Sequence, residues 1–156
     1  IGGWGSKKIA FIGDGFSNMT RSWCWAAKYL GFEFVIASPE AYAPPAEFLQ
    51  SLDAPNVTFT SDAVAAAKGA HVINTDVWIS MGQEDQSEKE AHFAPYQLND
   101  ALLAHAATDH IVLHCLPAYR EKEITESVLE KHADTIFQQA ENRLHAQKAI
   151  LVKLTQ

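Results

Sequence analysis

The sequence predicts an α/β protein: a doubly wound, Rossmann-like parallel sheet with helices on both faces, folded as a single domain over residues 1–156. Short apolar runs with strand character alternate with segments of helical spacing, and the connections between them are short. This alternation is typical of a parallel sheet covered by helices. A length of 156 residues, of which 47% are hydrophobic, suits one domain with a sizeable core.

The first half of the chain contains three of the predicted strands. Residues 8–13, KIAFIG, form an apolar run closed by glycine, which is typical of a buried strand. The segment 17–32 has apolar residues at helical spacing and a stop signal at Gly31. The remaining predictions in this half are a strand at 33–38, a helix at 44–52 that begins at proline, a strand at 56–60, and an Ala-rich helix at 61–70 with Ser61 as its N-cap.

The second half contains two clear strands and a shorter candidate. The clear strands cover 70–76 and 110–115, and between them we predict a long loop at 77–93 and a helix at 95–106. After the fifth strand we predict a loop at 116–123, a helix at 125–133, a short sixth strand at 134–139 and a closing helix at 141–154.

Composition limits the compartment and the partners. The net charge of −7 argues against nucleic acid, because phosphate binding favours a basic surface. The two cysteines, Cys24 and Cys115, are too few for a disulfide framework and favour a reducing, cytoplasmic setting. We find no apolar run long enough to span a membrane and no signal peptide, so we expect no membrane partner.

Ligands of doubly wound sheets bind beyond the carboxyl ends of the strands. The segments to inspect are therefore those that follow each strand, at 13–19, 38–40, 76–84 and 114–120.

The motif GDGFSN follows the first strand and resembles a dinucleotide-binding fingerprint in part. Asn18 stands where the third glycine would be, and Glu40 is a candidate for the ribose-binding acid. A nucleotide-binding oxidoreductase domain is therefore one alternative. In another, the glycines only form a tight turn and Asn18 caps the helix. In a third, Asn18 binds the polar end of a small substrate.

Asp76 ends the fourth strand and begins the segment DVWISMG. An acid at this position often caps a turn, but it can also bind an ammonium group, with Ser80 as a neighbouring hydroxyl. Gly82 would allow such a loop to close, and Trp78 would anchor it in the core.

The motif HCLP, residues 114–117, follows the fifth strand. Cys115 has polar neighbours and precedes a Leu-Pro break, whereas Cys24 lies in an aromatic helix and reads as an inert apolar residue. The peptide bond between Leu116 and Pro117 is a candidate for the cis form. His114 has no second ligand at a helical or hairpin spacing, so we predict no metal site.

Arg143 opens the predicted closing helix, within AENRLHAQKA. A cation in the first turn of a helix is unfavourable with the helix dipole, which suggests another partner such as a phosphate or a polarised carbonyl. A surface ion pair with Glu141 is the structural alternative.

Together, GDGFSNM, TDVWISMGQE, HCLPAYR and AENRLHAQKA resemble the second half of ornithine carbamoyltransferase, in the same order and at similar spacing. The resemblance covers essentially the whole chain. Its Ser-Met-Gly loop is more similar to the ornithine enzyme than to the relatives that use aspartate, putrescine or acetylated ornithine.

The resemblance implies transfer of the carbamoyl group of carbamoyl phosphate to the δ-amino group of L-ornithine, which gives citrulline and phosphate. It implies that ornithine is held by Asn18, Asp76, Ser80 and Met81, with Asp76 on the α-ammonium group. It also implies that Cys115 and Leu116 lie near the reacting atoms and that Arg143 contacts the carbamoyl oxygen.

This chemistry needs a neutral amine, although a free δ-amino group is protonated at neutral pH. Cys115 paired with Asp76 is one candidate proton acceptor, and the leaving phosphate is another. Arg143 would stabilise the developing oxyanion. The resemblance implies no metal and no organic cofactor.

The sequence departs from the family in two respects. Ser17 replaces the first of two asparagines that the family usually has, and the phosphate-binding Ser-x-Arg-Thr and His-Pro-x-Gln segments do not occur. We therefore expect an ornithine-binding domain without the carbamoyl phosphate domain, inactive alone, and monomeric or weakly associated although the family is typically trimeric. A non-catalytic module derived from the transferase remains an alternative.

Overall fold

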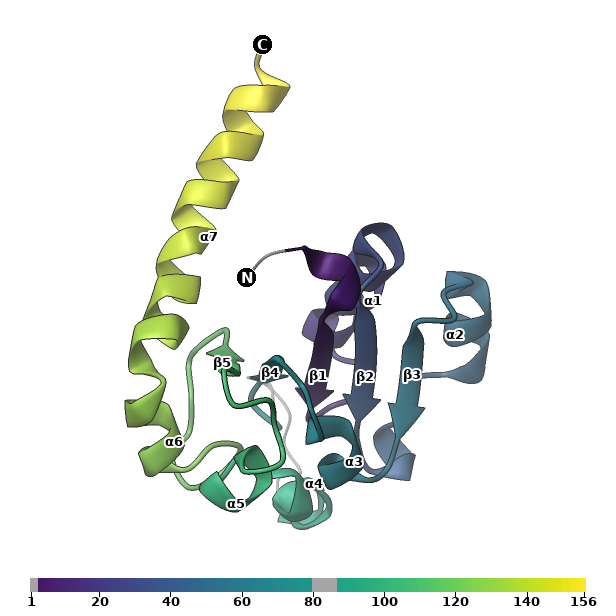
Figure 1. Ribbon diagram of the computed structural model, residues 1–156, viewed down its shortest axis with the longest axis vertical. Coiled ribbons are helices and arrows are strands. Elements are labelled where there is room, and N and C mark those ends of the chain that lie inside the picture. The colour runs from purple at the N-terminus through teal and green to yellow at the C-terminus, as the bar shows by residue number, and fades with distance from the viewer. Residues whose placement is uncertain (1–2, 80–86) are drawn as a thin grey trace.

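The computed structural model describes residues 3–79 and 87–156 and contains a five-stranded parallel sheet (Figure 1). The strand order is β3-β2-β1-β4-β5, and every neighbouring pair is parallel. The strands are β1 (Lys8–Ile12), β2 (Glu33–Ala37), β3 (Val57–Thr60), β4 (Val72–Thr75) and β5 (Ile111–His114). The predicted doubly wound, single-domain α/β fold is confirmed.

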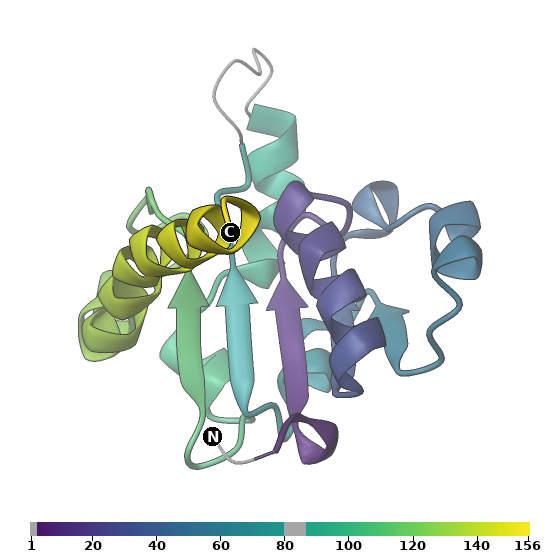
Figure 2. The same ribbon diagram turned by 90° about the horizontal axis from the view of Figure 1, so that it is seen from above.

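Helices cover both faces of the sheet (Figure 2). The α-helices are α1 (Asn18–Leu30), α2 (Ala46–Leu52), α3 (Ala63–Ala67), α4 (Ser87–Phe93), α5 (Asp100–Leu103), α6 (Glu126–Lys131) and α7 (Ala133–Leu154). Short 3-10 turns are η1 (Trp4–Ser6), η2 (Glu40–Tyr42) and η3 (Ala94–Tyr96). Within the described residues, no helix combines the length and the apolar character that crossing a membrane requires.

The two faces of β1 belong to two separate cores. Ile9 and Phe11 pack with residues of α1 and α2, whereas Ala10 and Ile12 pack with residues of α3, α5 and α6. Because successive side chains of a strand point to opposite faces, a strand buried on both sides is apolar throughout. This explains why KIAFIG could be predicted as a central strand.

Helix α1 has the limits that its sequence predicts. The Ser17 side chain caps it by accepting a hydrogen bond of 3.1 Å from the Thr20 N–H. Gly31 ends it in the left-handed conformation, with φ of 76°. Asn18 is thus the first residue of the helix, and the alternative in which it caps the helix is wrong.

Four other expectations for the chain are wrong. Residues 134–139 are helical and belong to α7, because no glycine or proline interrupts the helix after its start at Ala133. The interval predicted as a long loop contains α4, and the helix predicted at 95–106 is reduced to η3 and the four-residue α5. Asp62, rather than Ser61, caps α3.

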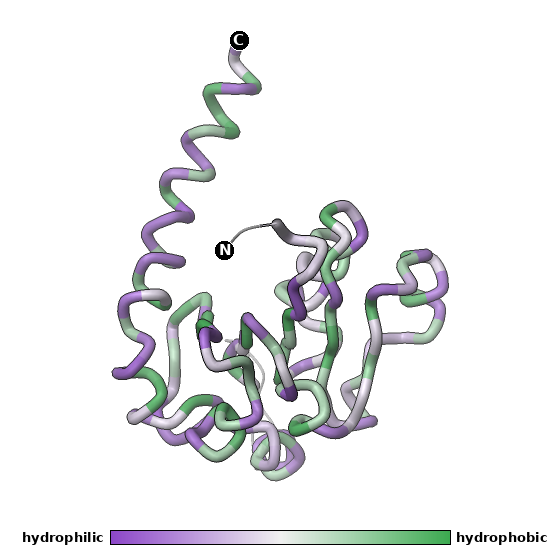
Figure 3. The backbone as a smooth tube through the Cα atoms, viewed as in Figure 1, coloured by the Kyte–Doolittle hydropathy of each residue, from purple (hydrophilic) through white to green (hydrophobic). Residues whose placement is uncertain are grey.

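Helix α7 runs away from the sheet and carries the C-terminus to the far end of the molecule (Figure 1). Its outer part alternates between hydrophilic and hydrophobic residues (Figure 3). Ile136 near its start is fully buried, whereas Leu144 is 58% exposed. Tertiary packing therefore fixes the beginning of the helix, and Arg143 extends from its interior.

Candidate active site

The site lies where the strand order reverses, at the carboxyl ends of the adjacent strands β1 and β4. The loop after β1 leads into α1 and presents Asn18, while Asp76 directly follows β4. Strand β5 pairs with β4 and brings Cys115 to the same edge. The sheet thus brings together segments that are far apart in the sequence.

The second glycine of GDGFSN, Gly15, is required by local packing. A Cβ on Gly15 would lie 2.6 Å from the Tyr42 carbonyl oxygen, and the Gly15 N–H donates to Ser38 Oγ at 3.1 Å. Asp14 forms an ion pair with Lys89 at 3.0 Å. These contacts favour the tight-turn interpretation over a nucleotide-binding fingerprint.

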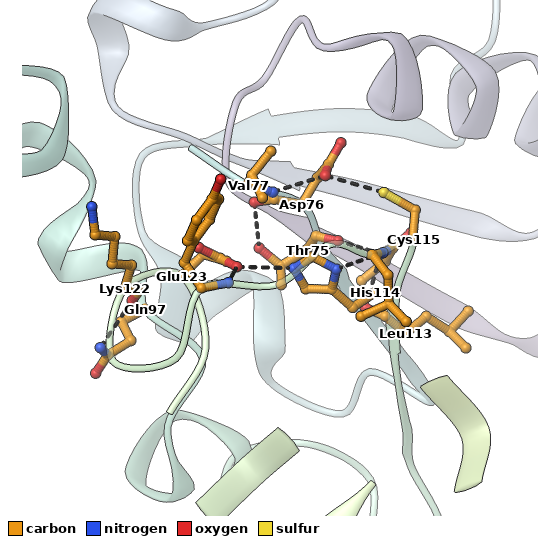
Figure 4. A network of polar contacts seen from close by, with 12 residues as sticks. Thr75, Asp76, Val77, Gln97, Leu113, His114, Cys115, Lys122 and Glu123 are labelled. Carbon is orange, nitrogen blue, oxygen red and sulfur yellow. Dashed lines mark hydrogen bonds and ion pairs between the residues drawn. The ribbon is translucent and has the colours of Figure 1, made fainter. Parts of the chain in front are cut away.

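Asp76 is held by two donors to one of its carboxylate oxygens. Oδ1 accepts hydrogen bonds from the Val77 N–H at 2.8 Å and from Cys115 Sγ at 3.1 Å. The second oxygen points away from both donors (Figure 4). The carboxylate is therefore oriented in advance, and its second oxygen can accept a hydrogen bond from a cationic ligand.

The Cys115 thiol is a hydrogen-bond donor at neutral pH. Burial raises the pKa of Cys115 to about 12, and the hydrogen bond to Asp76 and the negative charge of that residue act in the same direction, while Arg143 opposes them. Burial also raises the pKa of Cys24 to about 12. Cys24 lies fully buried in α1, as expected of an apolar residue.

His114 and Glu123 form a buried pair beneath the HCLP turn (Figure 4). His114 Nδ1 accepts a hydrogen bond from the Leu116 N–H at 3.0 Å, so the proton of a neutral ring lies on Nε2, which donates to Glu123 Oε1 at 3.1 Å. The same oxygen accepts the Tyr119 N–H at 2.6 Å. The peptide bond between Leu116 and Pro117 is cis, as the sequence suggested.

Sequence reasoning missed Glu123, which is 1% exposed and therefore needs partners. Nothing in its local sequence separates it from its neighbours Glu121 and Lys122, which are exposed. A buried acid in a charged loop is recognisable only once the loop folds onto His114.

Asp76, His114 and Cys115 each offer a potential metal ligand, and these atoms lie within 4.8 Å of one another. Both ring nitrogens of His114 already have partners, and the Cys115 thiol carries its proton. A metal ion here would have to displace a hydrogen bond from a buried histidine, so the arrangement favours a hydrogen-bond network.

A pocket of about 420 Å³ opens beside this network. It is lined by four predicted site residues and three others: Asn18, Met19, Cys115, Leu116, Gln139, Ala140 and Arg143. Asp76 is not among these lining residues, and its hydrogen bond to Cys115 links it to the pocket wall. Ser80 and Met81 lie outside the described residues.

Arg143 lies in the pocket for a different reason from the predicted one. It sits in the interior of α7 and not in a first helical turn, so the helix-dipole argument is wrong. Gln139, one helical turn earlier, also lines the pocket, and its buried Oε1 has no hydrogen-bond partner among the described residues. The mistaken strand at 134–139 concealed this residue.

The doubly wound sheet and the pocket at its carboxyl edge are typical of an α/β domain that binds a small polar ligand. Residues 6–154 match the family described as aspartate/ornithine carbamoyltransferase, Asp/Orn binding domain, and the chain belongs to that family.

Several similar proteins are ornithine carbamoyltransferases. The one from Akkermansia muciniphila is 61% identical over 154 residues, covering 98% of this chain and 50% of that protein. The solved structure of the anabolic enzyme from Campylobacter jejuni has a TM-score of 0.87 at 41% identity, covering 97% of this chain and 52% of that one. The structure from Pyrococcus furiosus also has a TM-score of 0.87, at 40% identity, covering 96% and 50%.

The chain thus spans about half the length of the relatives that it matches. The resemblance found in the sequence motifs is confirmed.

Proposed function

We propose that this chain supplies the ornithine-binding side of an ornithine carbamoyltransferase, which converts L-ornithine and carbamoyl phosphate to L-citrulline and phosphate. The observation that carries the proposal is the Asp76–Cys115 hydrogen bond beside a pocket that Arg143 also lines. Family membership supports the same substrate class.

Asp76 is the proposed anchor of the substrate. Its second carboxylate oxygen would accept the α-ammonium group of ornithine in a charge-assisted hydrogen bond. Asn18 at the start of α1 would bind the polar end of the amino acid, and by resemblance Ser80 and Met81 complete the contacts. Such a site selects an amino acid by its charge pattern and leaves the δ-amino group free to react.

The reaction forms a C–N bond from the neutral δ-amine to the carbamoyl carbon and breaks the C–O bond to phosphate, which leaves with the electron pair. The amine must lose protons, yet the Cys115 thiol already carries one. In our proposal the δ-ammonium group first gives one proton to water, and Cys115 and Leu116 position the neutral amine. The leaving phosphate takes the second proton as the C–N bond forms. Arg143 stabilises the negative charge that develops on the carbamoyl oxygen. These steps use no metal or organic cofactor.

The carbamoyl phosphate side would come from sequence equivalent to the other half of the relatives. Anion binding by a helix start and by arginine needs groups of the Ser-x-Arg-Thr kind, which these 156 residues lack. We therefore propose that the chain alone is inactive and is monomeric or weakly associated, whereas a trimer at micromolar concentration in light scattering would contradict this. A cytoplasmic location and the absence of nucleic-acid and membrane partners belong to the same proposal.

Ornithine binding to the purified chain tests the proposal. We expect ornithine to shift the NMR signals of residues around Asp76 saturably. N-α-acetylornithine, which lacks the α-ammonium group but keeps the δ-ammonium group, should leave them unchanged. Asp76→Asn should abolish the shift, while Asp109→Asn, which removes an exposed acid elsewhere, should retain it. Equal binding by both variants would overturn the assignment of Asp76.

A further inference from the structure

Two histidine rings meet at the end of β5 that is opposite to Cys115. His110 precedes the strand and His132 joins α6 to α7, and their ring centroids are 5.4 Å apart with planes inclined at 41°. The Nε2 atom of each ring is buried and has no hydrogen-bond partner among the described residues. A buried polar atom without a partner costs free energy, so two together need an explanation.

The hydrogen bonding of His110 determines which of its nitrogens is free. His110 Nδ1 lies 2.6 Å from the Ala107 carbonyl oxygen. Because a carbonyl only accepts hydrogen bonds, Nδ1 carries the proton, and Nε2 of the neutral ring presents a lone pair. A metal-binding histidine has this arrangement, in which one nitrogen donates to a backbone carbonyl and the other binds the ion.

Charged side chains of both signs lie near His132. Asp100, Lys131 and His110 lie close enough to His132 to interact with it electrostatically. Asp100 belongs to α5 and also accepts a hydrogen bond from Ser127 at 2.8 Å. Neutral imidazole binds metals, and the carboxylate offsets part of the positive charge of an ion.

The separation of the rings fits one shared ion. Zinc–nitrogen bonds are about 2.0–2.1 Å long, so the centres of two imidazoles on one ion fall roughly 5–6 Å apart. The observed separation of 5.4 Å lies in this interval. No third His, Cys, Asp or Glu of the described residues joins these two in a ligand cluster, so within that part of the chain the two imidazoles are the proposed side-chain ligands.

We infer that His110 and His132 form a two-histidine site for a borderline divalent transition-metal ion such as Zn²⁺, Ni²⁺ or Cu²⁺, bound through both Nε2 atoms. The site links the start of β5 to the junction of α6 and α7. An ion there would hold the base of the helix that carries Arg143 against the sheet.

The inference is tested with the untagged chain after treatment with a chelator, titrated with Ni²⁺ by calorimetry and thermal unfolding. All proteins carry Cys115→Ser, which removes a competing thiol ligand. We expect one saturable site per chain and a higher Tm with the ion. His110→Gln and His132→Gln should each weaken binding at least about tenfold, and His105→Gln, at an exposed position, should not.

Two further readouts keep the result decisive. Circular dichroism and the Tm without metal show whether each variant folds. In the protein that keeps both His110 and His132, the ¹⁵N chemical shifts of the two imidazole rings show which nitrogens bind the metal ion. Shifts at Nε2 of both rings support the site. Absence of saturable uptake, or uptake that both glutamine variants retain, overturns it.

Discussion

Strand β5 has a histidine at each end, and the two are held differently. At the carboxyl end, both ring nitrogens of His114 have partners, and the ring is fully buried. Just before the amino end, His110 forms a hydrogen bond through Nδ1 only. Its Nε2 atom, beside His132, has no hydrogen-bond partner among the described residues. The comparison teaches that residue type does not assign a role: a closed network makes His114 a structural part of the HCLP turn, and a free lone pair makes His110 a ligand candidate.

The largest expected effect comes from breaking the closed network. Glu123→Leu would leave the His114 Nε2–H and the Tyr119 N–H buried without an acceptor, so we expect about 3 kcal/mol of lost stability. Urea unfolding measures this loss. Glu126→Leu, at an exposed position of the next helix, should change the stability by less than about 0.5 kcal/mol. Similar losses in both variants would show that the buried pair has no special importance.

The next effect tests how tightly the carboxyl edge is packed. Gly15→Ala would place a Cβ 2.6 Å from the Tyr42 carbonyl oxygen, and we expect a loss of about 1–3 kcal/mol. Gly5→Ala is the matched control, because a Cβ at Gly5 meets no atom within 4 Å. Thermal unfolding distinguishes the two variants. An unchanged Tm for Gly15→Ala would mean that the turn can shift to accommodate the added Cβ.

The third prediction concerns the alkylation rate of the Cys115 thiol. Asp76→Asn removes the acceptor and the charge that raise the pKa of Cys115, so this pKa should fall. Each unit of decrease raises the thiolate fraction at pH 8 about tenfold, and alkylation by iodoacetamide should accelerate accordingly. Cys24→Ala in both proteins leaves one thiol to follow. Slower alkylation of the Asp76→Asn protein would contradict the assigned hydrogen bond.

The smallest effect has the opposite sign. Arg143 lowers the pKa of Cys115 and is the weakest of its influences, so Arg143→Gln should slow alkylation slightly. Because Arg143 is exposed, we expect the stability to change by less than about 0.5 kcal/mol. Alkylation rates across pH 8–10 measure the first effect and urea unfolding the second. An unchanged rate would indicate that Arg143 lies too far from the thiol to act on it, and faster alkylation would contradict the stated direction of its effect.

The sequence predicted what depends on local patterns and on the rules of parallel sheets. β1 and α1 follow from apolar periodicity and a glycine stop, and the proximity of Asp76 to Cys115 follows from both residues ending strands. Glu123 and the His110–His132 pair could not be predicted, because loop folding and helix docking create them. The first residues of α7, 134–139, were predicted as a strand. The prediction was wrong because β-branched residues also occur in helices when tertiary packing favours the helix.

The most direct test of the proposed function is citrulline production in a mixture. The chain would be combined with a separately expressed carbamoyl phosphate domain of a related ornithine carbamoyltransferase, with both substrates and with each half alone as control. Our account predicts citrulline only in the mixture, lost with Asp76→Asn and kept with Asp109→Asn. Citrulline from the chain alone, equal amounts with both variants, or none despite a complex detected by light scattering would contradict it.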